Sequence, residues 1–184
     1  LGHRVLRELR AEAVRTAAVI DPAAPTAVMV KERRTALSTS VHYYRTGSAG
    51  GRLCPQDVPA DLVTGAAWVH VTGITPALSP SAAATVEHVL DAARGAGVPV
   101  SFDVNHRSRL WRGAREAGEA EAATTYRQLA SRADLVFAGL DEAALLAPGA
   151  EQLQELATGI QALGPAEVVL KLGAEGAFAV EGEQ

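Results

Sequence analysis

The sequence has few of the residues that mark several large classes of protein. Cys54 is the only cysteine in 184 residues, so no disulfide can form within the chain, and a reducing cytoplasm is the expected compartment. We interpret its thiol as a small loop or surface group. No run approaches the roughly 20 apolar residues of a membrane-spanning helix, and no basic segment followed by an apolar one heads the chain as a secretory signal would. We therefore expect no membrane partner.

An excess of basic residues is missing as well. Seventeen Lys and Arg stand against 21 Asp and Glu, which gives a formal net charge of -4. Because nucleic-acid surfaces need clustered surplus cations, we expect no nucleic-acid partner. A pocket for a small anion remains open, since it needs only a few local cations. The absence of a Gly-x-Gly-x-x-Gly turn after a strand argues against a nicotinamide-dependent oxidoreductase.

The residues that are present divide the chain into two unlike parts. Within 26–46 two β-rich runs, separated by polar residues, predict an antiparallel flap. After a loop rich in Gly, Pro and Ala, strand and helix patterns alternate over 62–184, which predicts a parallel sheet flanked by helices. The chain opens inside a helical pattern and stops shortly after a new strand begins. We therefore expect residues 1–184 to be one incomplete α/β domain cut from a longer chain.

The α/β part is expected to contain four strands and four helical segments. Ser79 can cap a helix that begins at Pro80 and ends near Gly95 and Gly97. The other helices are expected over Glu116–Arg132, Asp141–Leu146 and Glu151–Leu163, and the strands over Trp68–Thr72, Val98–Val104, Asp134–Ala138 and Glu167–Leu172.

The most informative stretch runs from Ser101 to Trp111, where a strand that looks buried passes into ligand-binding side chains. Asn105 and His106 supply an amide and an imidazole, and Arg107 and Arg109 supply two guanidinium groups. Parallel strands bring their carboxyl ends to one edge, where ligands bind. We expect that edge to collect the segments 72–76, 105–107, 139–142 and 171–176.

Two further patterns suit a polar anion. Tyr43 and Arg45 lie two apart in a predicted strand and so share a face, where a phenol and a guanidinium can hold a sugar acid. A packed aromatic and a surface ion pair are the alternative reading of this pair. Gly173 and Gly176 can bring backbone N–H groups to a phosphate, or can equally form a tight hairpin turn into 177–180.

Four segments carry a resemblance to a known family. They are His-Tyr-Tyr-Arg-Thr-Gly-Ser-Ala-Gly at 42–50, Gly-Ile-Thr-Pro-Ala-Leu-Ser-Pro at 73–80, Asp-Val-Asn-His-Arg at 103–107 with Trp111, and Val-Val-Leu-Lys-Leu-Gly-Ala-Glu-Gly at 168–176. In this order and at these spacings the chain resembles the ribokinase-like (PfkB) carbohydrate kinases, and most closely the 2-keto-3-deoxygluconate kinases. The resemblance implies a three-layer α/β/α fold with a small β flap.

What the resemblance implies about function is an ATP-dependent kinase that phosphorylates a primary hydroxyl of a small sugar acid, with Mg²⁺ on the phosphates. The residues that match the family's sites fall into three groups. Tyr43, Arg45 and Arg107 match substrate contacts; Asn105, Arg107, Lys171, Gly173, Ala174, Glu175 and Gly176 match the nucleotide side; Glu142 matches a glutamate that acts on the Mg²⁺ shell through water. Flaps of this type imply a homo-oligomer.

The chain departs from the family pattern at several positions. Gly139 replaces the asparagine of the family's Asn-x-x-Glu element, Met29 stands where relatives tend to place a tyrosine, and His106 takes a place often held by tyrosine. The Gly-Ala-Gly-Asp segment that carries the family's catalytic base is not among the 184 residues, nor is the Gly-Gly segment that grips the sugar. We expect both to lie outside the printed residues. Fructokinase, or another sugar kinase of the family, is one alternative function. A non-catalytic sugar- or nucleotide-binding protein of the same fold is the other.

Overall fold

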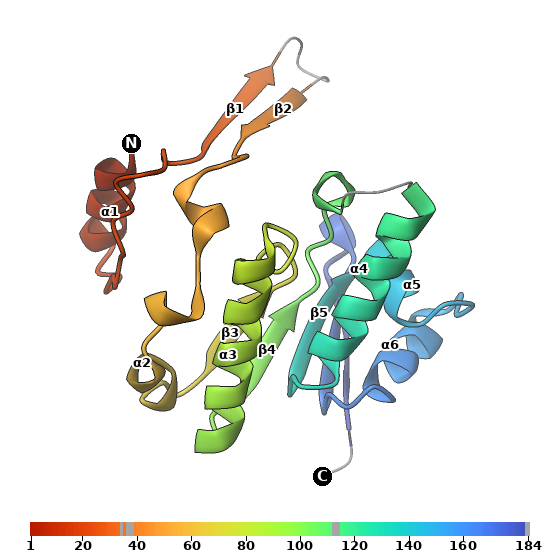
Figure 1. Cartoon of the computed structure of the whole chain (residues 1–184). Helices are drawn as coiled ribbons and strands as arrows, with labels where there is room; N and C mark the ends of the chain where they lie inside the picture. Colours follow the sequence, from red (N-terminus) through yellow and green to blue (C-terminus); the bar gives the residue numbers. More distant parts are fainter. Residues whose placement is uncertain (34, 36–38, 112–114, 183–184) are drawn as a thin grey trace.

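The computed structural model describes residues 1–33, 35, 39–111 and 115–182 (Figure 1). Its α-helices are α1 Gly2–Ala11, α2 Ala60–Thr64, α3 Pro80–Ala96, α4 Arg115–Ala130, α5 Leu140–Leu146 and α6 Leu153–Gln161, and its strands are β1 Val28–Arg33, β2 Thr39–Tyr44, β3 Val69–Thr72, β4 Val100–Asp103, β5 Leu135–Gly139, β6 Glu167–Lys171 and β7 Ala177–Glu181. Four short 3-10 helices are η1 Ala49–Arg52, η2 Pro55–Asp57, η3 Ser108–Leu110 and η4 Gly173–Glu175.

The main sheet has the strand order β3-β4-β5-β6-β7, and its first four strands run parallel, as the alternating pattern predicts. The fifth strand, β7, pairs antiparallel with β6. Only the short η4 turn separates the two strands, which leaves no room for the crossover that a parallel partner requires. The prediction that the Gly173–Gly176 turn forms a hairpin is therefore confirmed, and its role in phosphate binding stays a prediction.

Helix α3 shows how the local sequence fixes an element. The Oγ of Ser79 accepts a hydrogen bond from the N–H of Ala82 at 3.1 Å, and Pro80 occupies the first helical position. Gly97 ends the helix in the left-handed region at φ 65°, which a residue with a Cβ adopts only at a cost. Between these ends Ala82, Val86 and Leu90 are buried against the sheet side of the molecule.

The helices cover one face of the main sheet. Because each of β3 to β6 lies beside its predecessor, right-handed crossovers all place their helices on the same side. Figure 1 shows α3 and α4 over that face. Burial follows the same alternation: Val136 and Ala138 are fully buried, whereas Leu135 and Phe137, on the other face of β5, are only half-buried. The sheet and this helix layer are two of the three layers that the resemblance predicts, and the consecutive strand order places the crossover helices on one face.

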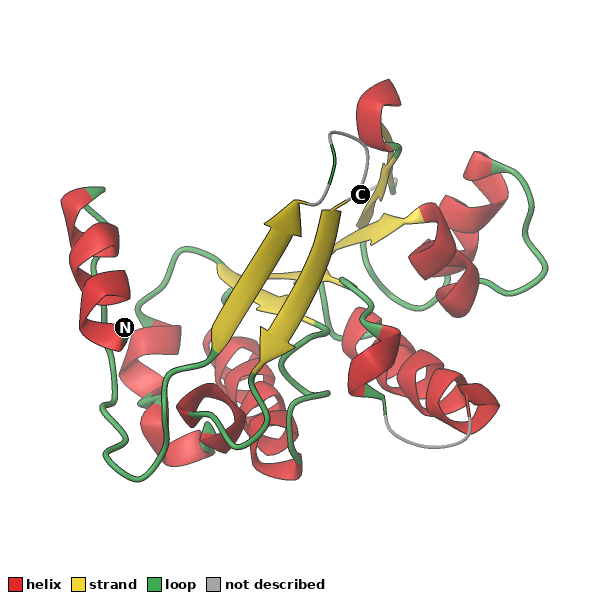
Figure 2. Cartoon of the chain, turned by 90° about the horizontal axis from the view of Figure 1, so that it is seen from above, coloured by secondary structure: helices red, strands yellow, loops and turns green. Residues whose placement is uncertain are grey.

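The flap is the antiparallel pair β1–β2, in which Met29 lies opposite Tyr43. It stands beyond the carboxyl ends of the parallel strands, at the end where η3 also lies (Figure 1), and Figure 2 shows the same arrangement from above. Residues 34 and 36–38 of the predicted 26–46 range lie outside the described residues. A two-stranded sheet is marginal alone, and Val30, Tyr43 and Tyr44 remain 46%, 50% and 66% exposed.

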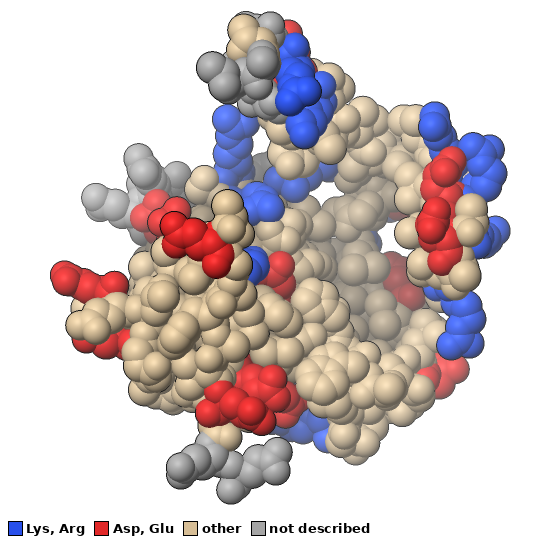
Figure 3. Space-filling view, turned by 180° about the vertical axis from the view of Figure 1, so that it is seen from behind, with Lys and Arg blue, Asp and Glu red and all other residues tan. Residues whose placement is uncertain are grey.

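Helix α1 stands apart from the main sheet and has no buried residue. Seen from behind, the surface is hollowed between α1, the flap and the main sheet (Figure 3), and a cavity of about 430 Å³ lies between α1 and the segment 18–26. In the part of the chain that the structure describes, no helix combines the length and apolar character needed to cross a bilayer.

Candidate functional site

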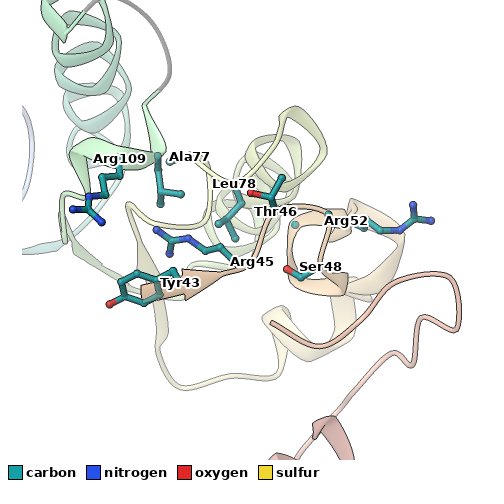
Figure 4. A pocket seen from close by; sticks show the side chains of 11 residues that line it. Tyr43, Arg45, Thr46, Ser48, Arg52, Ala77, Leu78 and Arg109 are labelled. Carbon is teal, nitrogen blue, oxygen red and sulfur yellow. The ribbon is translucent and has the colours of Figure 1, made fainter. Parts of the chain in front are cut away.

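A cavity of about 260 Å³ lies between the flap and the segment that follows β4 (Figure 4). Tyr43, Arg45, Thr46, Gly47, Ser48, Gly51 and Arg52 line it from the flap side, and Ala77, Leu78, Arg109 and Leu110 line it from the core side. None of these lining residues is acidic. The cavity offers a phenol, hydroxyls and guanidinium groups, a combination that suits a polar anion.

Tyr43 and Arg45 share one face of the flap, as their spacing predicts. The Cζ of Arg45 lies 4.7 Å from the centroid of the Tyr43 ring, within the range of a cation–π contact. Figure 4 shows both side chains at the cavity wall, with the guanidinium above the ring. This stacking restrains a long side chain and leaves its hydrogen-bond donors directed at the cavity.

The two arginines after β4 lie in different places. Arg107 is exposed, its Nη1 donates to the carbonyl oxygen of His106 at 2.9 Å, and it is not among the residues that line the flap cavity. Arg109, two residues further, lines the cavity together with Arg45. Of the two arginines that follow β4, the one whose side chain reaches this cavity is therefore Arg109.

Asn105 makes the turn from β4 into this segment. Its φ of 43° is left-handed, a region that asparagine tolerates better than most residues. Its Nδ2 donates to the Oγ1 of Thr72 at 3.4 Å, which links the ends of β3 and β4. Gly73, the next residue after β3, leaves no room for a side chain, because a Cβ there would come within 2.2 Å of the Val104 carbonyl oxygen.

The buried phenol of Tyr126, in α4, anchors the same segment from below. Trp111 Nε1 donates to its oxygen at 2.8 Å, and His106 Nδ1 lies 3.0 Å from that oxygen. Burial raises the pKa of Tyr126 to about 12 and lowers the pKa of His106, although the Glu142 and Glu119 carboxylates act on His106 in the opposite direction. The pair is thus held as a neutral phenol and a neutral imidazole, with residues 106–111 fixed between them.

Glu142, near the start of α5, joins three elements at the strand edge. Its Oε2 accepts the N–H of Gly139 at 2.7 Å, and its Oε1 accepts the N–H of His106 at 2.8 Å. The Nζ of Lys171 lies 3.4 Å from Oε2 and 2.6 Å from the Oδ1 of Asp103. Burial works to lower the pKa of Lys171, but the hydrogen bond to Asp103 and the charges of Glu142 and Asp103 together raise it. Lys171 is therefore a fully charged partner of two carboxylates.

The donor set at this edge fits a metal ion that is held through water. Among the described residues no three acidic, histidine or cysteine side chains form a group that could hold an ion directly. Each oxygen of Glu142 accepts a backbone N–H and Oε2 also faces Lys171, so Oε1 keeps a lone pair that a water in a metal's shell could use. Lys171 neutralises only one of the two carboxylate charges of Glu142 and Asp103, so this edge keeps a net negative charge.

The turn at 173–176 follows Lys171 and is exposed to solvent. Gly173 and Gly176 have φ values of 61° and 94°, and a Cβ at either would meet no atom within 4 Å. The two glycines are needed here for their backbone conformation, and the open space beside them leaves the backbone accessible to a ligand.

The similarity of the chain to known proteins establishes its family. The whole chain, residues 1–184, matches the family model described as pfkB family carbohydrate kinase. The chain belongs to the PfkB family of carbohydrate kinases. This confirms the resemblance carried by the four sequence segments.

Within the PfkB family, the chain is similar to kinases of keto-deoxy sugar acids. It is 36% identical over 180 residues to a 2-dehydro-3-deoxygluconokinase of Bacillus subtilis, covering 97% of this chain and 54% of the relative. It is 34% identical over 180 residues to a 2-dehydro-3-deoxygluconokinase of Thermoproteus tenax, covering 96% of this chain and 53% of that relative. The chain thus spans about half the length of these curated relatives.

Solved structures of the PfkB family have the same fold. A PfkB protein from Polaromonas sp. JS666 superposes with a TM-score of 0.87 at 31% identity, over 97% of this chain and 58% of that one. A 2-dehydro-3-deoxygluconokinase from Thermotoga maritima superposes with a TM-score of 0.80 at 23% identity, over 96% of this chain and 57% of that chain, a likeness of fold alone. The ribokinase-like α/β architecture is therefore confirmed.

Sequence reasoning singled out Tyr43, Arg45, Asn105, Arg107 and Glu142, and the structure brings Tyr43 and Arg45 to the cavity and the other three to the strand edge. It did not assign roles to Arg109, Tyr126 or Asp103. Arg109 carried a signal, because it was one of two guanidinium groups after β4, but its direction depends on the η3 turn. Tyr126 carried none, since it reads as one more apolar position of α4.

Proposed function

We propose that this chain forms the sugar-acid and nucleotide-binding part of an ATP-dependent kinase that phosphorylates a primary hydroxyl of 2-keto-3-deoxygluconate or a closely related acid. The observation that carries the proposal is the flap cavity, in which a stacked phenol and guanidinium face a wall without acidic groups. The similarity to kinases named for 2-dehydro-3-deoxygluconate supports the same substrate.

Each predicted residue has a role in this proposal. Tyr43 and Arg45 contact the sugar acid and orient its carboxylate, with Arg107 at the junction of sugar and phosphates. Asn105 and Lys171 lie on the phosphate side, and the exposed turn from Gly173 through Ala174 and Glu175 to Gly176 borders the nucleotide.

Mg²⁺ would neutralise the phosphates, and Glu142 would hold its water shell, as the position of that carboxylate allows. ATP is the phosphoryl donor in this proposal, and a ribokinase-like protein of E. coli whose structure is a complex with ATP and Mg²⁺, 19% identical to this chain, has the same fold.

In phosphoryl transfer these residues contribute position and charge. Holding the two reactants together removes the entropic cost of their encounter. The 184 residues contain no Gly-Ala-Gly-Asp segment, so the proton acceptor of the substrate hydroxyl is not assigned to any of them. We also propose a cytoplasmic homo-oligomer, in which a second copy covers the exposed outer face of the flap.

Two other functions make different predictions. A fructokinase would bind a neutral ketose as well as it binds an acid, and a non-catalytic member of the fold would bind sugar or nucleotide without transferring phosphate. The cavity favours an acid, because Arg45 has no carboxylate partner within the described residues and a neutral sugar would leave its charge unpaired.

Calorimetric titration of the 184-residue chain tests the proposal. We expect 2-keto-3-deoxygluconate to bind more tightly than fructose, and Mg²⁺ with a non-hydrolysable ATP analogue to bind independently of the sugar. The Arg45→Gln variant should lose about tenfold or more in affinity for the acid, as expected for a charge-assisted hydrogen bond. Equal affinity for fructose and the acid would favour the fructokinase alternative, and failure to bind either ligand class would contradict the proposal.

A further inference from the structure

Arg109 is the residue of the flap cavity that the sequence resemblance leaves without a role. It lies in η3, whose turn is closed by a hydrogen bond from the N–H of Leu110 to the carbonyl oxygen of Arg107 at 2.8 Å. Trp111 follows and is tied to Tyr126. The backbone of Arg109 is therefore held on both sides, although its side chain is exposed.

The charges that line the cavity indicate a role for Arg109. Three arginines line the cavity, and one of them is already neutralised, because Arg52 Nε lies 2.6 Å from the Oδ2 of Asp21. Figure 4 shows the Arg52 guanidinium directed away from the cavity, and those of Arg45 and Arg109 at the side of the Tyr43 ring. Within the described residues neither Arg45 nor Arg109 has a carboxylate partner. The cavity thus holds two cations and no anion.

We propose that Arg109, together with Arg45, binds the carboxylate of the sugar acid and so determines the preference of the site for acids over neutral sugars. This inference rests on the proposed function and refines it. Two guanidinium groups from different elements can bind the two oxygens of one carboxylate, and each charge-assisted pair is stronger than a neutral hydrogen bond. Arg107 is the other candidate for this role, but its Nη1 is held by the His106 carbonyl and it does not line the cavity.

The experiment compares an acid with its neutral ester in a set of variants. The affinities of the wild-type chain, Arg109→Gln, Arg109→Lys, Arg107→Gln and Arg52→Gln for 2-keto-3-deoxygluconate and for its methyl ester are measured by calorimetry. Arg109→Gln should weaken binding of the acid about tenfold and leave the ester within about twofold, because only the acid has a charge to lose. Arg109→Lys keeps the charge without the planar pair of donors and should fall between them.

Arg52→Gln is the matched control, since it removes an equal charge from the same wall but from a side chain that Asp21 already neutralises. Its affinity for the acid should fall by no more than about twofold, clearly less than that of Arg109→Gln. The wild-type preference for the acid should also shrink between 0.1 and 1 M salt, and more than in Arg109→Gln, because the Debye length falls from about 10 to about 3 Å over that range.

Three results would overturn the inference. Arg109→Gln could bind the acid and the ester as the wild type does, it could lose both equally, or Arg107→Gln alone could abolish the preference. A wild-type chain that binds no acid would instead refute the proposed function, and the inference with it. The two failures are distinguishable because one is seen in the wild type and the other only in the variants.

Discussion

The hydroxyl of Tyr126 is the point at which a buried helix holds the segment after β4, and its removal is a sharp test of that arrangement. The Tyr126→Phe variant keeps the ring, so the contacts with Phe102 and Trp111 at centroid distances of 6.2 and 5.4 Å are preserved. It removes the acceptor for Trp111 Nε1 and the partner of His106 Nδ1. Only the polar connection is lost.

The expected loss of stability follows from these two bonds. A neutral hydrogen bond contributes about 1 kcal/mol, and a buried donor left without a partner costs somewhat more, which gives about 2 kcal/mol for the pair. Trp111 and His106 are half-buried, so water can replace part of the lost hydrogen bonding, and the loss of stability should lie between about 1 and 2 kcal/mol. For a domain of this size each kcal/mol lowers the melting temperature by about 2 to 4 °C, so a loss of about 1 to 2 kcal/mol should lower it by about 2 to 8 °C.

Urea unfolding followed by circular dichroism and by tryptophan fluorescence measures the change. Tyr44→Phe is the matched control, because the Tyr44 side chain is 66% exposed, and its loss should stay within about 0.5 kcal/mol. The NMR signals of the His106 ring give a second readout, because the variant removes the hydrogen-bond partner of its Nδ1 and these signals should shift. A Tyr126→Phe variant as stable as Tyr44→Phe would refute the anchoring role.

Three more predictions concern the same edge of the sheet. Gly73→Ala places a Cβ 2.2 Å from the Val104 carbonyl oxygen and should cost about 3 kcal/mol in urea unfolding, whereas Gly95→Ala, with no atom within 4 Å, should gain up to about 1 kcal/mol; equal effects would refute the steric argument. Lys171→Met leaves Asp103 and Glu142 facing each other without a cation and should cost about 1 kcal/mol, less in 0.5 M salt; no dependence on salt would contradict the electrostatic cause. Because burial lowers the pKa of His106, the unfolded chain takes up this proton more readily than the folded protein, so stability should fall as the pH drops through about 6.5. Thermal unfolding between pH 8 and 5 should show this fall, and His106→Gln should flatten it over that window.

Much of the fold could be predicted because its causes are local. Ser79, Pro80 and Gly97 are next to the helix ends that they fix, and the observed bounds of α3 agree with the expectation. The antiparallel β7 also had a local cause, since a turn as short as η4 cannot carry a crossover. The position of the crossover helices on one face of the sheet has a cause that involves the whole sheet. It follows from the strand order, which no stretch of sequence states by itself.

The candidate site divides in the same way. That Tyr43 and Arg45 share a face follows from the period of a strand, and the structure confirms it. Which arginine after β4 reaches them does not follow from a period, because η3 interrupts the extended chain and sets the directions of Arg107 and Arg109 independently. The role of Tyr126 was hidden for another reason. A hydroxyl in a buried helix position looks like any core residue until its partners, 15 and 20 positions away in sequence, are brought to it.

The positive charges at the carboxyl end of the sheet are of two kinds, and the difference bears on function. Lys171 is paired with Asp103 and Glu142, and this cluster carries one positive and two negative charges, so it attracts a cation rather than a phosphate. Within the described residues Arg45 and Arg109 have no carboxylate partner, so they attract an anion. In the proposed function, the carboxylate of the sugar acid would bind at the two arginines, and the metal bound to the phosphates would lie at the acidic cluster. If the proposed function is correct, a neutral sugar would leave both guanidinium groups without a counter-charge, and that cost would favour an acid over a neutral sugar.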